Sequence, residues 1–387
     1  MRVLSFSYCF PNRVNPTWGV FIAQRLVTLS QREKLQVCSP APWFPVLSAR
    51  RGDPGPEKDA WKELTVHRPR FFYFPGVFKN HDARFYAKGL SRWLREFCQV
   101  WRPDVLDAHF VWPDGVGVAL LARELKIPYI ITLRGKLYEC LPIPSQREQC
   151  AAALQRASAV ISVSGQLAGE ARKLGVSDDR LVIIPNGIDR EYFHSRDKRT
   201  CRKELGLPEE GRLLVTVAHL GHRKGHHEVI YALASLPDDV RLVIVGAPAQ
   251  GGTPEMLRAV AREVGVEDRL ILPGHQPYEK VPIYFSAADA SVLASYREGC
   301  PNAILESLAC GTPVIATDVG AVRDILSDPH VGRIVPPRKV GPLRKALADV
   351  LDNQWNSAEV IKASGVKSWD EVAQEVQKVL HKAAYSS

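Results

Sequence analysis

The sequence predicts an α/β fold of two doubly wound domains, each built on a parallel sheet. A chain of 387 residues has room for roughly two to three domains that can each bury a core. Short apolar strands alternate with helical patterns, which favours parallel strands joined by right-handed crossovers. A polar segment, residues 190–203, interrupts this alternation, so we place the domains at residues 1–194 and 195–369.

The first series of elements fills residues 1–194. We expect strands at residues 1–8, 35–39, 104–110, 129–133, 159–163 and 181–184, and helices at residues 20–31, 82–101 and 165–174, with another ending at Lys126. Gly19, His109 and Arg134 lie where strands give way to loops or helices. Ligands of doubly wound sheets bind at the carboxyl ends of the strands, so these three residues are candidates for a site. Gly19 also fits a plain turn, and His109 also fits a structural histidine.

The helix at residues 82–101 combines aromatic and basic faces. We expect its aromatic residues to lie mainly in the core, with an acceptor-facing or membrane-facing surface as the alternative. These residues are Phe85, Tyr86, Trp93, Phe97 and Trp101.

A second alternating series fills residues 195–369. Its expected strands are residues 213–218, 241–245, 270–272, 290–294 and 313–316, with helices between them. The second series does not copy the first in sequence. Residues 368–382 carry the pattern of a last amphipathic helix.

The most informative stretch is residues 297–313, REGCPNAILESLACGTP. Its apolar residues recur at helical spacing, Pro301 suits the first turn, and Gly311 suits the position just past the helix end. Glu298 therefore lies in the loop before a short helix, and Glu306 lies between one and two turns inside it.

This arrangement has chemical consequences. The free N–H groups at a helix N-terminus attract anions, above all phosphates. A phosphate held there would leave Glu298 and Glu306 able to accept hydrogen bonds from hydroxyls on either side of it. A nucleotide sugar has that shape, although two solvated carboxylates near a helix start are the plain alternative.

A second candidate phosphate element is the loop AHLGHRKGHHEVI, after the first strand of the second series. It crowds His219, Arg223 and Lys224 between glycines, which let backbone approach a ligand. Cations at such a loop can neutralise a diphosphate leaving group. A solvated basic loop is again the alternative.

The stretch at residues 297–313 closely resembles the donor-site signature of family 4 glycosyltransferases, whose fold is GT-B. Glu298 matches the first Glu of the family's E-x7-E motif, and Glu306 matches the second. The resemblance implies that Glu298 holds hydroxyls of the donor sugar, that Glu306 binds ribose, and that the intervening loop supplies backbone N–H groups. That loop comprises Gly299, Cys300, Pro301, Asn302 and Ala303.

The resemblance extends over nearly the whole chain. Lys224 matches a phosphate ligand of the family, Arg223 supplies a second charge, and His219 stands where the family usually has Arg. The loop with Gly274 and His275 is implied to hold the base through backbone groups. Two domains facing a cleft are implied, with residues 370–387 crossing back to the N-terminal domain.

The N-terminal half is similar to bacterial enzymes of surface polysaccharide synthesis, of the teichuronic-acid type. One departure concerns the acceptor side, where Arg134 replaces the His of a Thr-x-His-Gly motif. Arginine stays charged and cannot act as a base, so Arg134 can only bind or orient an anionic oxygen. His109 could take a proton, although a histidine at a strand end is as often structural.

Composition limits the partners. Lys and Arg exceed Asp and Glu by 51 to 42, a net charge of +9, which favours anionic partners. No long basic block suggests nucleic-acid binding. Eight scattered cysteines without C-x-x-C spacing, and no membrane-length apolar run, favour a cytoplasmic protein. Its basic surface could touch anionic lipid at the inner face of the cell membrane.

We therefore expect a retaining glycosyltransferase that moves a sugar from a nucleotide diphosphate to a hydroxyl of a glycan or lipid-linked glycan. The chain lacks Asp-x-Asp, so we expect no metal and no other cofactor. A nucleotide-sugar epimerase or hydrolase of the same fold and a non-catalytic nucleotide-sugar-binding protein are the alternatives. A dinucleotide oxidoreductase is less expected, because no strand is followed by G-x-G-x-x-G.

Overall fold

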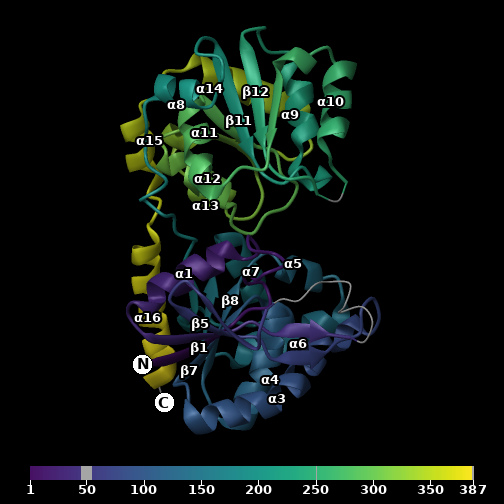
Figure 1. The fold of residues 1–387 in the computed structure, drawn as a ribbon, viewed down its shortest axis with the longest axis vertical. Coiled ribbons are helices and arrows are strands. Elements are labelled where there is room, and N and C mark those ends of the chain that lie inside the picture. The colour runs from purple at the N-terminus through teal and green to yellow at the C-terminus, as the bar shows by residue number, and fades with distance from the viewer. Residues whose placement is uncertain (45–54, 250, 386–387) are drawn as a thin grey trace. The chain divides into compact units, whose positions relative to one another are not determined.

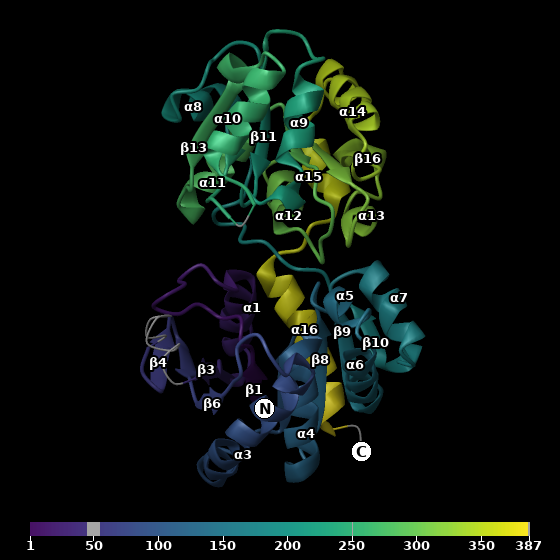
Figure 2. The ribbon, with the colours of Figure 1, turned by 90° about the vertical axis from the view of Figure 1, so that its right-hand side faces the viewer.

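The computed structural model describes residues 1–44, 55–249 and 251–385. The chain forms two compact units (Figures 1 and 2). Unit 1 comprises residues 1–186 and 369–387, and unit 2 comprises residues 187–368. From the sequence we placed these boundaries at 194/195 and 369/370. The chain changes unit just before Ile188, which forms a parallel bridge with Ser368.

Unit 1 is built on an eight-stranded sheet of order β10-β9-β8-β7-β1-β2-β5-β4, parallel except that β4 runs antiparallel to β5. Its strands are β1 (Arg2–Phe6), β2 (Lys34–Cys38), β4 (Lys58–Trp61), β5 (Leu64–His67), β7 (Val105–His109), β8 (Tyr129–Leu133), β9 (Ala159–Ser162) and β10 (Leu181–Ile183). A separate ribbon pairs β3 (Ala41–Trp43) with β6 (Arg70–Phe72). The predicted strands are present within one or two residues at each end, whereas β3 to β6 were not predicted.

The helices of unit 1 cover both faces of this sheet. They are α1 (Val20–Ser30), α3 (Asp82–Val100), α4 (Val116–Leu125), α5 (Leu137–Cys140), α6 (Pro144–Arg156), α7 (Gly165–Lys173) and α16 (Trp369–Tyr385). The C-terminal helix α16 buries Val372, Val376 and Leu380 in one core with Ile22 and Leu26 of α1. The last helix is therefore part of unit 1, although it follows unit 2 in sequence.

Unit 2 is built on a six-stranded parallel sheet of order β13-β12-β11-β14-β15-β16. Its strands are β11 (Arg212–Val217), β12 (Val240–Val245), β13 (Leu270–Gly274), β14 (Ala290–Leu293), β15 (Val314–Thr317) and β16 (Gly332–Val335). Its helices are α8 (Lys198–Glu204), α9 (His226–Leu233), α10 (Pro254–Glu263), α11 (Val281–Ala287), α12 (Asn302–Ala309), α13 (Val322–Ile325), α14 (Val340–Asp352) and α15 (Ser357–Ser364). One apolar core lies on each face of this sheet.

Short helical turns complete the two units. They are η1 (Lys79–His81), η2 (Val111–Gly115), η3 (Asp178–Arg180), η4 (His222–Lys224), η5 (Glu267–Arg269), η6 (Tyr278–Lys280) and η7 (Pro329–Val331). The two sheets, parallel except for β4, with helices on both faces, confirm the predicted α/β class. In each unit the parallel strands end at one edge, which is where loops can build a site.

The cysteines and the lengths of the apolar helices were also considered in the sequence. All eight cysteines are free, and Cys300 and Cys98 are the two that are only partly buried. Within the described ranges, no helix is both long and apolar enough to span a lipid bilayer.

The docking of α16 can be tested by truncating one of its core residues. Leu380 is fully buried, so Leu380→Ala should lower the free energy of unfolding of unit 1 by about 2–5 kcal/mol through lost apolar contact and a residual cavity. The matched change Lys378→Ala, on the exposed side of the same helix, should alter it by less than about 0.5 kcal/mol. Denaturant titration of the full chain measures both, and equal effects would contradict this packing.

Candidate active site

The loop between β14 and α12 is held in place by its neighbour between β15 and α13. Ala321 N donates a hydrogen bond to the carbonyl oxygen of Gly299 over 2.9 Å. Gly320 has a φ of +60°, and an added Cβ there would lie 2.5 Å from the carbonyl oxygen of Glu298. Only glycine fits this approach. Two loops that are far apart in sequence therefore fix the backbone that carries Glu298.

The same loop is tied to the loop between β11 and α9. Lys224 Nζ donates to Glu298 Oε1 over 2.6 Å, and the two side chains keep only 18% and 11% of their exposure. Arg223 donates to the carbonyl oxygen of Arg297 at 3.0 Å, and Tyr296 N donates to the carbonyl oxygen of Arg223 at 2.9 Å. Because β11 and β14 are neighbouring parallel strands, their C-terminal loops meet at one edge.

Helix α12 starts one residue later than predicted, with Pro301 as its N-cap and Asn302 and Ala303 in its first turn. Its end is as predicted, because Gly311 just beyond it has a φ of +77°. Its N-cap residue, Pro301, makes no side-chain hydrogen bond to the first turn of α12. Its N-terminal N–H groups therefore present positive partial charge beside the Glu298 loop.

Glu306, inside α12, differs from Glu298 in its surroundings. Burial raises the pKa of the Glu306 carboxyl to about 7, and no charged neighbour opposes this shift. Among the residues that the structure describes, none forms a hydrogen bond or an ion pair with this carboxyl group. A half-desolvated carboxyl group without a partner can accept hydrogen bonds from a ligand.

The remaining predicted residues of unit 2 lie at the same sheet edge. Burial first, and then the charges of Lys224, His275 and Arg223, lower the pKa of His219. Gly274 ends β13, and its carbonyl oxygen accepts a hydrogen bond from Gly246 N at 3.0 Å. Cys300 is partly exposed. The structure thus brings the predicted residues of unit 2 together around one electropositive edge.

Sequence reasoning missed the residues that support this edge from α9. Tyr296 hydroxyl contacts His227 Nε2 at 2.8 Å and donates to Glu228 Oε1 at 2.9 Å. The guanidinium of Arg338 lies over the Tyr296 ring, 4.5 Å from its centroid. The position of Tyr296, two residues before Glu298 and close to a strand end, was the available signal.

Gly19 and Arg134 belong to unit 1. Gly19 is the N-cap of α1 with a φ of +72°, and an added Cβ there would lie 2.2 Å from the carbonyl oxygen of Cys9. The buried Arg134 donates to Asn186 Oδ1 at 2.8 Å and lies 4.8 Å from the Phe21 ring centroid. Arg134 is thus held rigidly at the C-terminal end of β8.

For His109 the sequence left open a proton-accepting role and a structural role. Its side chain is fully buried, and its Nε2 lies 3.0 Å from Asp107 Oδ2, which also accepts a hydrogen bond from Ser5. Burial lowers the pKa of His109 to about 4, although Asp107 opposes this shift. His109 is therefore neutral at pH 7 and lies beneath the surface of unit 1 in this conformation.

Unit 1 also contains a large pocket of about 740 Å³. It opens beside the C-terminal ends of β1 and β2 and mixes aromatic rings with polar groups. Its aromatic lining residues are Tyr8, Trp18, Phe71, Tyr73 and Trp112, and its charged ones are Arg68, Lys79, Asp82, Lys136 and Glu139. The ion pairs of Lys79 with Asp82 at 3.6 Å and of Lys136 with Glu139 at 2.5 Å fix four of these charges.

Comparison with known proteins assigns both halves of the chain. Residues 23–192 match the family model described as Glycosyltransferase Family 4, and residues 197–381 match the one described as Glycosyl transferases group 1. The Bacillus subtilis protein named "Putative teichuronic acid biosynthesis glycosyltransferase TuaC" is 32% identical over 90% of this chain and 88% of its own length. A D-inositol 3-phosphate glycosyltransferase of Xylanimonas cellulosilytica is 28% identical over 70% of each chain.

Solved structures agree with the fold. The sucrose-phosphate synthase of Thermosynechococcus elongatus superposes with a TM-score of 0.77 at 18% identity, covering 100% of both chains. Anabaena Alr3699/HepE in complex with UDP also superposes with a TM-score of 0.77, at 19% identity, covering 98% of this chain and 100% of that one. The chain therefore belongs to the group 1, family 4 glycosyltransferases and has their GT-B fold.

Proposed function

We propose that this glycosyltransferase moves a sugar from a nucleotide diphosphate to a hydroxyl of a glycan or lipid-linked glycan, with retention of configuration, in surface polysaccharide synthesis. The observation that carries the proposal is the Lys224–Glu298 pair beside the N-terminus of α12, with Glu306 inside that helix and without a hydrogen-bond partner among the described residues. The name of the Bacillus subtilis relative supports the polysaccharide role. The Alr3699/HepE complexes with UDP and with UDP-glucose support the donor class.

In this proposal the donor spans the edge of unit 2. The diphosphate lies at the start of α12, where Lys224 and Arg223 offset its charge. The residues from Gly299 to Ala303, apart from Pro301, donate their backbone N–H groups to it. Glu306 accepts hydrogen bonds from the ribose hydroxyls. The loop with Gly274 and His275 holds the base, and Glu298 accepts hydrogen bonds from the sugar.

The transfer step needs charge stabilisation more than a protein base. The bond between the anomeric carbon and the β-phosphate oxygen breaks, and the acceptor oxygen bonds to the same face of that carbon. The acceptor proton passes to the departing phosphate oxygen. Lys224, Arg223 and the α12 N-terminus stabilise the leaving diphosphate, which is why we propose a reaction without metal. Arg134 orients an anionic oxygen, and His109 stays neutral beneath it.

We propose that the 740 Å³ pocket of unit 1 binds the acceptor. Its aromatic rings can lie against the apolar faces of a sugar, while its fixed charges orient hydroxyls. We further propose that the enzyme works in the cytoplasm, on acceptors presented at the inner face of the cell membrane.

Removing Lys224 should weaken the diphosphate site selectively. Thermal shift without metal, against UDP, GDP, ADP and TDP, should show one nucleotide that stabilises the protein by about 2.7 kcal/mol at a hundredfold excess over Kd. Lys224→Ala should weaken that nucleotide about 10- to 100-fold, because a charge-assisted hydrogen bond is lost, and leave the nucleoside unchanged. The control Lys280→Ala, an exposed cation of unit 2, should change neither. Equal weakening of nucleotide and nucleoside would contradict the assignment.

Neutralising Glu298 should affect turnover more than binding. Glu298→Gln keeps the shape but accepts weaker hydrogen bonds from the transferring sugar, so we expect about a 100-fold or greater loss of transfer with a modest change in nucleotide affinity. Glu279→Gln, an exposed control on the same unit, should transfer normally. Transfer to a cell-extract acceptor, measured with labelled donor, gives both rates. Wild-type turnover in Glu298→Gln would remove Glu298 from the site.

The raised pKa of Glu306 predicts pH-dependent binding of the ribose. Hydroxyls donate to the ionised carboxylate, which predominates above pH 7 and is about 10% populated one unit below. Affinity for the nucleoside, which carries no titrating phosphate, should therefore fall several-fold as pH drops from 8 to 6. Calorimetric titration should show this slope in the wild type and a flat response in Glu306→Gln. The same slope in both proteins would assign the titration to another group.

A further inference from the structure

The outward side of α3 in unit 1 is strongly basic. Arg84, Lys88, Arg92 and Arg95 are all exposed and recur at helical spacing, so they lie along one side of the helix. Arg92 pairs with Glu96 at 2.8 Å, and Arg95 pairs with a residue of α4 at 2.5 Å. Arg84 and Lys88 make no side-chain hydrogen bond or ion pair with any described residue.

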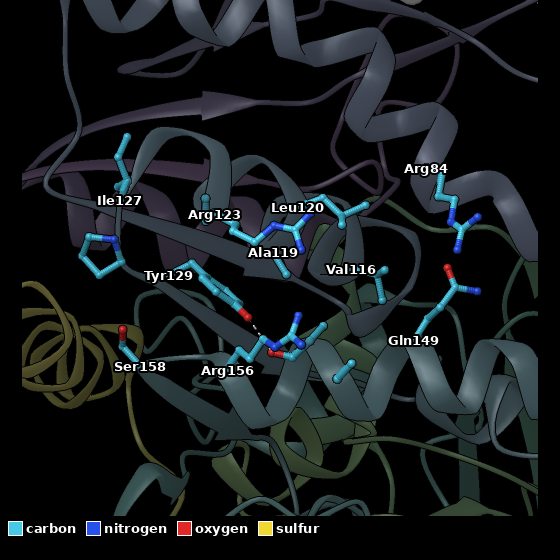
Figure 3. A pocket seen from close by; sticks show the side chains of 14 residues that line it. Arg84, Val116, Ala119, Leu120, Arg123, Ile127, Tyr129, Gln149, Arg156 and Ser158 are labelled. Atoms are coloured by element: carbon cyan, nitrogen blue, oxygen red, sulfur yellow. Dashed lines mark hydrogen bonds between the residues drawn. The ribbon is translucent and has the colours of Figure 1, made fainter.

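One flank of α3 borders a pocket of about 370 Å³, which we call the arginine pocket (Figure 3). Arg84 of α3, Arg123 of α4 and Arg156 of α6 line it, over a floor that includes Val116 and Leu120. None of the described lining residues is acidic, and none of the three arginines has an ion-pair or hydrogen-bond partner among the described residues. The pocket therefore combines unneutralised positive charge with an apolar floor.

The helix dipole gives a simpler reason for two of these arginines. Arg123 and Arg156 stand in the last turns of α4 and α6, where a cation offsets the negative end of the dipole. The helix dipole does not explain why both side chains line the same pocket, or why Arg84 of α3 lines it as well. Because helix C-termini repel anions, an anion in this pocket would be held by the guanidinium groups alone.

A cluster of aromatic rings lies at the start of α3, and we call it the aromatic patch and define it as Trp43, Phe72, Phe74, Phe78 and Phe85. Only Phe85 belongs to α3, and Phe74 and Phe85 are half-buried. Phe74 is its centre, with ring centroids 4.7 Å from Phe72, 5.5 Å from Phe78 and 5.4 Å from Phe85. Trp43 lies 6.3 Å from Phe72. Trp43 and Phe72 are 40% exposed and Phe78 is 60% exposed, which is unusual for clustered large aromatic residues.

The two features meet on α3. Phe85 is the member of the aromatic patch that belongs to this helix, and the preceding residue, Arg84, lines the arginine pocket. We call the 740 Å³ pocket of unit 1 the acceptor pocket. Tyr73, which lies between Phe72 and Phe74 in the sequence, lines it, so the patch and the acceptor pocket are neighbours along the chain. The arginine pocket and the aromatic patch therefore adjoin the same turn of α3, through Arg84 and Phe85.

We propose that this surface docks on an anionic lipid bilayer. The arginine pocket takes the phosphate of a lipid headgroup above its apolar floor, and the aromatic patch enters the interfacial layer, where Trp and Phe side chains are stable. The inference deepens the proposed function, because it places the acceptor pocket of unit 1 at the surface that presents lipid-linked acceptors. It commits to lipid headgroups as the occupant.

Co-sedimentation of the full chain with vesicles tests this surface. We expect binding to vesicles of phosphatidylcholine and phosphatidylglycerol in equal amounts, and none to phosphatidylcholine alone. The triple change Arg84→Gln, Arg123→Gln, Arg156→Gln should weaken binding on the order of a hundredfold, at about 1 kcal/mol for each lost cation. Trp43→Ala with Phe78→Ala should remove the part of the binding that survives high salt.

The control is Arg258→Gln, Arg344→Gln, Lys345→Gln, which removes the same charge from exposed positions of unit 2 and should bind almost as well as wild type. Circular dichroism of each variant verifies folding. Equal losses in both triple variants, unchanged binding in the first, or no vesicle binding by wild type would overturn the proposal. So would soluble glycerol phosphate binding at the pocket of a protein that ignores vesicles.

Vesicle binding is measured without nucleotide, so its failure is distinguishable from failure of the donor site. A protein that is stabilised by a nucleoside diphosphate but ignores anionic vesicles would keep the proposed function and lose this inference. A protein that binds anionic vesicles but no nucleotide would keep this inference and lose the proposed function.

Discussion

The ion pair between Lys224 and Glu298 is the interaction on which the candidate site depends. It joins the loops after β11 and β14, and the hydrogen bonds of Arg223 and Tyr296 repeat that connection through the backbone. A mostly buried pair of this kind is costly to desolvate, so it contributes more to geometry than to stability. The desolvation cost of the pair is offset when an anionic ligand also binds Lys224.

The two glutamates of the E-x7-E pattern show how one helix produces two chemical environments. Glu298 lies in the loop and has a cationic partner, whereas Glu306 is half-buried inside the helix without one, and burial raises the pKa of its carboxyl to about 7. Separated environments of this kind let two identical side chains take different roles. In the proposed donor site, one faces the transferring sugar and the other faces ribose.

Much of this arrangement could be predicted from the sequence because it depends on local patterns. The C-terminal end of α12 and the positive φ at Gly311 follow from helix signals. The family resemblance implied that Lys224 and Glu298 serve one donor site, whereas their direct ion pair was not predicted. The partner of each cation could not be predicted, because Arg223 contacts a backbone carbonyl while Lys224 takes the carboxylate. That choice depends on loop conformation, which periodicity does not encode.

Other features could not be predicted, either because the strands are too short or because burial depends on tertiary packing. The ribbon of β3 and β6 consists of three-residue strands, too short for an alternating pattern to identify. His109 and Asp107 point to the same side of β7 because they are two residues apart, yet sequence alone did not show that both would be buried. Burial depends on which helices cover the sheet, and so the sequence could not decide between a proton-accepting and a structural His109.

A crystal structure of the protein with the nucleoside diphosphate that stabilises it tests the central claim most directly. The account predicts the β-phosphate at the N-terminus of α12, within hydrogen-bond distance of Lys224 Nζ, and the ribose hydroxyls on the Glu306 carboxylate. A diphosphate bound elsewhere, with the Lys224–Glu298 pair intact and Glu306 still without a partner, would contradict it.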